Sequence, residues 1–168
     1  PYSSDFEYEN AKYRCHNTLS DQLEREEIIS GYFLVAGGKH TDCILALKSD
    51  LTDSESLQIY ISDSRNCDNK WHLASVNGQN LLIRLASEKN FYYGAIVNLD
   101  SVQAEMNHQG RYDSQTIFFS ENTPNTDKEH ILASSASSRM DVVLSMEVSQ
   151  KECYRGLPYL NQIFIVVA

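Results

Sequence analysis

Four aspartates in two polar segments of the chain carry the side chains best suited to hold a cation. Asp50 and Asp53 belong to the first segment, and Asp63 and Asp68 to the second. Carboxylate oxygens from loops are ligands that Ca²⁺ prefers. The spacing predicts a calcium site at these aspartates, with solvated loop acids as the alternative. The sequence predicts no other cofactor.

Catalytic signatures do not occur in the chain. The five histidines show neither His-x-x-x-His nor His-x-His spacing, and there is no Gly-x-Ser-x-Gly motif or glycine-rich phosphate loop. We therefore expect a protein that performs no chemistry. A hydrolase with a carboxylate pair assembled from distant strands is the alternative.

Aromatic side chains are numerous and predict a binding surface. The chain has ten tyrosines, and tyrosine offers both an apolar ring and a hydroxyl to a ligand. We expect Tyr92, Tyr93 and Tyr112 to bind ligand, together with His130 from the long polar segment 120–138. Ordinary packing on strands is the alternative for the tyrosines.

The four cysteines are widely spaced and include no Cys-x-x-Cys pair, which argues against a zinc ribbon. Their even number predicts two disulfides, for which three connectivities are possible. We favour Cys43–Cys67, which would tie neighbouring strands, and Cys15–Cys153, which would join the two ends of the chain. Disulfides form in oxidising compartments, so we expect a secreted or extracellular protein. Four free thiols in a cytosolic domain are the alternative.

The net charge of −9 and the pI of about 4.9 limit the partners. A surface this acidic cannot neutralise phosphates, so we expect no binding to nucleic acid. No apolar run approaches the roughly 18 residues that a membrane span needs, so no membrane insertion is expected.

Short apolar runs that alternate with polar turns predict an antiparallel β fold. Leu57, Ile59 and Ile61 recur with the period of a half-buried strand, and Asn77-Gly78 between two apolar runs predicts a hairpin. The expected strands are 28–36, 42–48, 56–62, 70–76, 80–86, 91–98, 115–119, 141–148 and 162–167. This spacing indicates a β-sandwich, with a β-barrel as the alternative.

Helices have little place in this prediction. Residues 1–27 form a lead-in segment with at most one or two short helical turns, and the whole chain 1–168 is expected to be a single β domain. Ser120–Ser138 is predicted to be an exposed, mobile loop near the recognition surface. The only tryptophan, Trp71, is expected to be buried between the sheets.

Residues 43–85 resemble the laminin-G-like and related concanavalin-type modules. The matching segments are Ile44–Leu47, Leu57–Ile61, Asn69–His72 and Asn77–Ile83. The resemblance implies a jelly-roll sandwich with a role in adhesion or glycan recognition.

Together these features predict an extracellular recognition or adhesion module that binds a protein or a glycan and is not an enzyme. A lipocalin-like barrel that carries a small apolar ligand is the first alternative, and a secreted hydrolase is the second.

Overall fold

The computed structural model describes residues 2–36, 42–63, 68–137, 140 and 142–155. The chain divides into two compact units, one of residues 1–102 with 139–141 and one of residues 103–138 with 142–168. Each unit is described by itself. That both fold as one domain stays a prediction.

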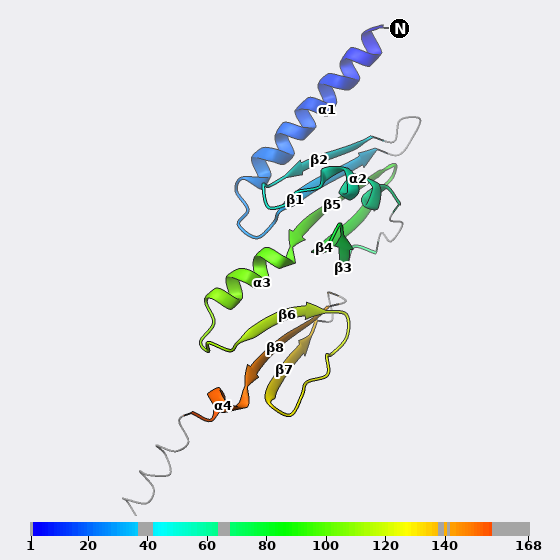
Figure 1. Ribbon diagram of the computed structural model, residues 1–168. Helices are drawn as coiled ribbons and strands as arrows, with labels where there is room; N and C mark the ends of the chain where they lie inside the picture. Colours follow the sequence, from blue (N-terminus) through cyan, green and yellow to red (C-terminus); the bar gives the residue numbers. More distant parts are fainter. Residues whose placement is uncertain (1, 37–41, 64–67, 138–139, 141, 156–168) are drawn as a thin grey trace, which may run out of the picture. The chain divides into compact units, whose positions relative to one another are not determined.

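The first unit contains a five-stranded antiparallel sheet in the order β2-β1-β5-β4-β3 (Figure 1). Its strands are β1 (Gly31–Ala36), β2 (Cys43–Leu47), β3 (Trp71–Val76), β4 (Gln79–Glu88) and β5 (Phe91–Asn98). The predicted hairpin is confirmed, because β3 and β4 are joined by Asn77 and Gly78. These two residues have φ angles of 48° and 80°, the left-handed values that a two-residue hairpin requires.

Helix α2 (Ser54–Asp63) covers one face of this sheet. The Asp53 carboxylate begins the helix by accepting hydrogen bonds from the Ser56 amide at 2.9 Å and the Ser56 hydroxyl at 2.7 Å, as N-cap residues do. Leu57 and Ile61, one helical turn apart, are buried, whereas Ile59 is 58% exposed. The prediction of a strand over 56–62 is wrong.

The core of the first unit lies between α2 and this sheet face. Side chains alternate between the two faces of a strand, so every second residue of each strand faces the helix. The buried members of the core are Phe33, Val35, Leu51, Leu57, Ile61, Ala74, Val76, Leu81, Ile83, Leu85 and Ile96.

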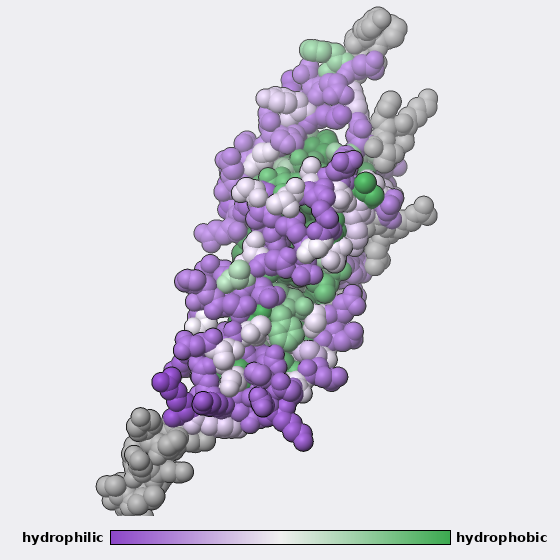
Figure 2. All heavy atoms as spheres, viewed as in Figure 1, coloured by the Kyte–Doolittle hydropathy of each residue, from purple (hydrophilic) through white to green (hydrophobic). Residues whose placement is uncertain are grey.

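Helix α1 (Tyr2–Leu23) occupies the predicted lead-in segment. This length corrects the expectation of one or two turns. The hydroxyl of Tyr8 donates to Asp42 at 2.5 Å and the Lys12 ammonium lies 3.2 Å from the same carboxylate, so polar contacts connect the helix to the start of β2. Hydrophilic residues cover most of α1 in Figure 2. The helix was missed because it lacks a wide apolar stripe, the usual signal of a helix that packs on a core.

The second unit contains a three-stranded antiparallel sheet in the order β6-β8-β7. Its strands are β6 (Thr116–Ser120), β7 (His130–Ala136) and β8 (Val143–Ser149), preceded by α3 (Leu99–His108) and followed by α4 (Gln150–Cys153). Helix α3 starts at the end of β5, where the Asn98 side chain accepts a hydrogen bond from the Asp100 amide at 3.0 Å.

Strand β7 lies inside the segment predicted as one long loop, Ser120–Ser138. The strand pairs with β8 over its whole length, and the Ser134 and Ser145 hydroxyls, opposite each other in the register, lie 2.9 Å apart. The expectation of a loop is therefore wrong for residues 130–136. It holds for the connection that precedes them, residues 121–129.

The antiparallel β architecture is confirmed, because the described strands form two open antiparallel sheets, consistent with the sandwich class, and neither closes into a barrel. The described helices are longer and more numerous than the sequence predicts. Trp71 is only half-buried, which corrects the expectation of a fully buried side chain. It forms an isolated parallel bridge with Met140. The predicted strand 162–167 lies outside the described residues.

Candidate functional site

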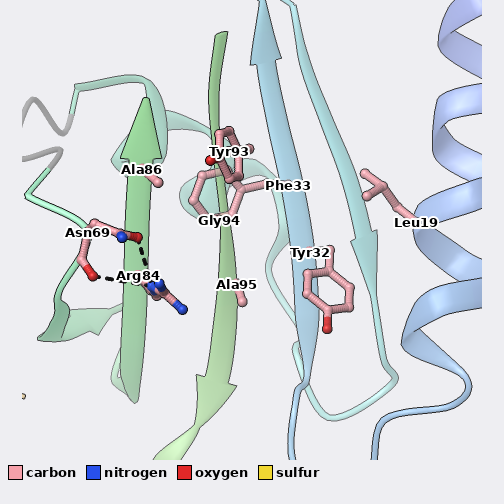
Figure 3. A pocket seen from close by; sticks show the side chains of 9 residues that line it. All are labelled: Leu19, Tyr32, Phe33, Asn69, Arg84, Ala86, Tyr93, Gly94 and Ala95. Atoms are coloured by element: carbon pink, nitrogen blue, oxygen red, sulfur yellow. Dashed lines mark hydrogen bonds between the residues drawn. The ribbon is translucent and has the colours of Figure 1, made fainter. Parts of the chain in front are cut away.

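A pocket of about 330 Å³ lies on the sheet face of the first unit that α2 does not cover. In the sheet register Arg84 is opposite Ala95, and Ala95 is also opposite Tyr32. Residues opposite each other point to the same face, so three strands contribute neighbouring side chains here. The lining residues are Leu19, Tyr32, Phe33, Asn69, Arg84, Ala86, Tyr93, Gly94 and Ala95 (Figure 3).

The floor of the pocket is made of small residues on β4 and β5. Ala86, Gly94 and Ala95 add little or no side chain above the sheet. Gly94 is also required for packing below it, because a Cβ atom there would lie 1.9 Å from the Arg84 carbonyl oxygen and 2.5 Å from Cζ of Phe33. These small residues therefore leave a depression in the surface of the sheet between the larger side chains around them.

Arg84 is held in place by Asn69, the residue two positions before β3. The Arg84 Nε donates to the Asn69 side-chain oxygen at 3.0 Å and to its carbonyl oxygen at 3.3 Å (Figure 3). Asn69 has a φ of 62°, a left-handed conformation that asparagine tolerates better than most residues. The Asn69 amide donates to the Leu85 carbonyl at 3.1 Å, which anchors this loop against β4.

The pocket is locally positive in an acidic chain. Among the described residues, no carboxylate oxygen lies within 4.0 Å of the Arg84 guanidinium. On the opposite side Tyr32 contributes a phenol. Burial raises the pKa of Tyr32, and the negative charge of Glu26 raises it further, so the hydroxyl remains a neutral hydrogen-bond donor. A ligand would meet apolar atoms below, aromatic rings beside it and a cation at one end.

The structure separates the four residues that the sequence predicts to bind ligand. Tyr93 lines the pocket, whereas Tyr92 points to the opposite face of β5, as its register partner Val35 does. Tyr112 lies in the second unit after α3, and His130 begins β7. Their role in binding stays a prediction.

The sequence analysis missed Arg84, Asn69 and Tyr32. The signal for Arg84 was present, because a single arginine interrupts the apolar run Leu81–Leu85 and alternation places it on the face opposite Ile83. Asn69 and Tyr32 had no comparable signal, since their contribution depends on which strands become neighbours.

The aspartates predicted to bind calcium serve different local contacts. Asp53 caps α2 and also accepts from the Asn77 side chain at 2.8 Å. Asp68 lies 2.7 Å from the His72 ring, and hydrogen bonding to His72 lowers the pKa of this aspartate. Asp63 ends α2. Over the described ranges, no group of three or more His, Cys, Asp or Glu residues is placed to hold a metal ion. Calcium binding stays a prediction.

Asp50 lies at one end of the sheet and has one buried carboxylate oxygen. One of its carboxylate oxygens, Oδ2, accepts a hydrogen bond from the Ser30 hydroxyl at 2.9 Å. The other, Oδ1, is buried and has no hydrogen-bond partner among the residues that the structure describes. Its backbone carbonyl accepts from the side chains of Gln79 at 3.0 Å and Asn98 at 2.9 Å. Asp50 thus joins β1, β4 and β5 at one end of the sheet.

Three of the cysteines lie on described elements, and each is a free thiol in the structure. Cys15 is on α1, Cys43 begins β2 and Cys153 ends α4. Burial raises the pKa of the Cys43 thiol to about 11, which makes it a poor nucleophile. Cys67 lies outside the described residues. Both disulfides, Cys43–Cys67 and Cys15–Cys153, stay predictions.

His130 should have a pKa above its ordinary value. Its Nδ1 lies 2.8 Å from an Asp127 carboxylate oxygen, and this hydrogen bond raises the pKa of His130. The stability that the charged pair contributes is therefore present at acidic pH and is lost as the pH rises through the raised pKa. Asp127→Asn should lower the His130 pKa in an NMR titration. The His16 signal, from α1, is the internal control, and an unchanged His130 pKa would contradict the pairing.

A second pocket, of about 420 Å³, lies in the second unit and is lined by Ser114, Ser149, Lys151, Glu152 and Arg155. Its central carboxylate is already satisfied. Glu152 accepts hydrogen bonds from the amides of Asp113 at 2.7 Å and Ser114 at 2.9 Å and from the Ser114 hydroxyl, and the hydrogen bond from the Ser114 side chain lowers its pKa. Glu152 therefore holds α4 to the loop after α3.

Comparison of the chain with protein-family models, curated proteins and solved structures finds no match. The resemblance to laminin-G-like modules stays a prediction. None of the described helices is both long enough and apolar enough to span a membrane.

Proposed function

We propose that this protein is a non-enzymatic recognition module that binds a sugar ring of a glycan in the pocket of the five-stranded sheet. The observation that carries this proposal is the combination of a flat floor of small residues, tyrosine rings beside it and polar groups held in fixed positions. Sugars present apolar C–H faces and hydroxyl edges, and both find counterparts here.

The size and lining of the pocket favour a sugar over the alternatives. Its volume of about 330 Å³ is at the small end for ligand sites, which run from about 300 to 1,000 Å³. A small apolar ligand would leave the terminal amino groups of Arg84 and the side-chain nitrogen of Asn69 without partners, which is costly when these groups lose contact with water. The open sheet also lacks the enclosed interior that a lipocalin-like carrier needs.

The lining favours binding over turnover. Among its residues there is no carboxylate, histidine, serine or thiol, the groups that serve most often as nucleophiles or general bases. We place the module outside the cell, in an adhesive or recognition role. The even number of cysteines and the acidic composition support this location.

The matched pair Tyr93→Ala and Tyr92→Ala tests the proposal. The two tyrosines are adjacent and both 43% exposed, but only Tyr93 lines the pocket. A glycan array followed by calorimetry on the strongest ligand should show that Tyr93→Ala weakens binding about tenfold, the equivalent of about 1.4 kcal/mol. Tyr92→Ala should leave the affinity within about twofold of the native value.

Two results would contradict this function. If no glycan binds the native protein, the proposal is wrong. If both tyrosine variants weaken binding equally, the ligand sits elsewhere on the chain and the pocket is not the site. Thermal melts of both variants control for unfolding, since both side chains lie on the surface of the same strand.

A further inference from the structure

We propose that the pocket selects an acidic sugar, a hexuronic acid whose carboxylate pairs with Arg84. This inference rests on the proposed glycan-binding function and adds the chemical class of the ligand. The contacts of Arg84, the charge of its surroundings and the neutral donors around it each support a carboxylate at this position.

The guanidinium has donors left for a ligand. Of its five N–H groups, the structure uses the one on Nε, which is shared between the two oxygens of Asn69. The terminal amino groups have no partner among the described residues. In Figure 3 the side chain extends from β4 toward β5 and Ala95, over the floor of the pocket. An arginine fixed through Nε can still present two parallel N–H groups to a carboxylate.

The net charge of the chain and the charge at Arg84 differ in sign. The chain has 23 acidic residues against 14 lysines and arginines, yet no carboxylate of the described residues neutralises Arg84. The net charge of −9 repels an anion at long range. At physiological salt that repulsion is screened beyond about 8 Å. The binding of a carboxylate in contact with the guanidinium therefore depends on the attraction between these two groups.

Neutral donors around the arginine suit the remainder of a sugar acid. The Tyr32 hydroxyl stays protonated, since burial raises its pKa, and the Asn69 side-chain nitrogen makes no hydrogen bond among the residues described. Sugar hydroxyls can accept from both groups. The ring can lie on the Ala86–Gly94–Ala95 floor beside Tyr93. An acidic sugar therefore satisfies every part of the lining.

The test compares acidic sugars with their neutral counterparts. D-glucuronate with D-glucose and D-galacturonate with D-galactose form two pairs that differ only in the carboxylate. Trp71 is the only tryptophan and lies opposite Arg84 in the β3–β4 register, so its fluorescence should report occupancy. The native protein should bind one acidic sugar at least tenfold more tightly than its neutral partner, the usual strength of a charge-assisted hydrogen bond.

Variants of Arg84 and Asn69 distinguish the effect of the guanidinium charge from the effect of its positioning by Asn69. Arg84→Gln should abolish the preference for the acid, and Arg84→Lys should retain part of it, because an ammonium lacks the planar fork. Asn69→Gly preserves the left-handed backbone but removes the side-chain acceptor, so it should reduce the preference with little change in melting temperature. Arg111→Gln, which removes an exposed arginine of the second unit, is the control.

The outcomes distinguish a failure of this inference from a failure of the proposed glycan-binding function. If acidic and neutral sugars bind equally well, and Tyr93→Ala weakens both, the pocket binds sugars but the carboxylate preference is wrong. If Arg84→Gln leaves the preference unchanged, Arg84 is not its source and the inference also fails. If none of the four sugars binds while the glycan array identifies another ligand of the pocket, only the inference is overturned. If no glycan binds at all, the proposed function is overturned as well.

Discussion

Gly94→Ala should destabilise the protein by about 3 kcal/mol, the upper part of the range for overpacking a core. The added Cβ atom would lie 1.9 Å from the Arg84 carbonyl oxygen and 2.5 Å from Cζ of Phe33. Neither neighbour can move freely, because one is backbone of β4 and the other is a side chain only 1% exposed. We expect β4 and β5 to separate locally, and urea melts followed by Trp71 fluorescence measure the loss.

Gly78→Ala is the matched control for this experiment. Gly78 has a φ of 80° and nothing within 4 Å of the position that a Cβ would take, so the substitution adds backbone strain without a clash. We expect it to cost about 1 kcal/mol. If Gly94→Ala costs no more than Gly78→Ala, the close packing between Phe33 and Gly94 is absent in solution. The floor of the pocket in solution would then also differ from the one described above.

Leu57→Ala should cost about 2 to 5 kcal/mol, whereas Ile59→Ala should cost less than about 0.5 kcal/mol. In α2, Leu57 packs into the core with 1% exposure and Ile59 points to solvent with 58% exposure. Truncating Leu57 leaves a cavity between the helix and the sheet. Truncating Ile59 removes a side chain that makes little buried contact.

This pair of variants distinguishes the helix from the strand that the sequence pattern predicts. In a strand, Leu57, Ile59 and Ile61 would all point to one face, and truncating Leu57 or Ile59 would cost similar amounts. Equal losses in denaturant melts would therefore contradict α2. Ile61→Ala serves as the positive control, since Ile61 is buried in both conformations.

The pocket depends on the same packing as these stability predictions. Phe33 lies beneath Gly94 on the core side, and Arg84 and Ala95 lie on the open side of the same strands. A displaced β5 would move the floor of the pocket relative to the guanidinium. Gly94→Ala should thus weaken glycan binding as well as stability, which is why surface variants such as Tyr93→Ala are the better test of function.

Local chemistry was sufficient to predict part of the fold. Asn77-Gly78 predicts its own hairpin, because both residues accept positive φ, and the flanking apolar runs then pair in the only register that a two-residue turn allows. The strands 71–76, 79–88 and 91–98 follow their predicted ranges closely. Short apolar runs bounded by turn residues indicate strands from local sequence alone.

Tertiary structure determined the secondary structure of the segments whose local signals conflict. The run Leu57–Ile61 fits a strand by its period of two, and it fits a helix by its spacing of four between Leu57 and Ile61. The Asp53 cap and the open sheet face beside the segment decide for the helix. Strand β7 is the opposite case, since its serines and alanines have little β propensity and form a strand because β8 offers backbone partners.

The residues of the candidate site are brought together almost entirely by the tertiary structure. Arg84 could be recognised in the sequence as a charge within an apolar strand, but its partner Asn69 is 15 residues away and Tyr32 comes from β1. The strand order β1-β5-β4 brings these residues around one floor. The sequence by itself determined which neighbouring segments pair as strands. Long-range strand order decided which residues of the site meet, because that order follows from burying the opposite face of the sheet under α2.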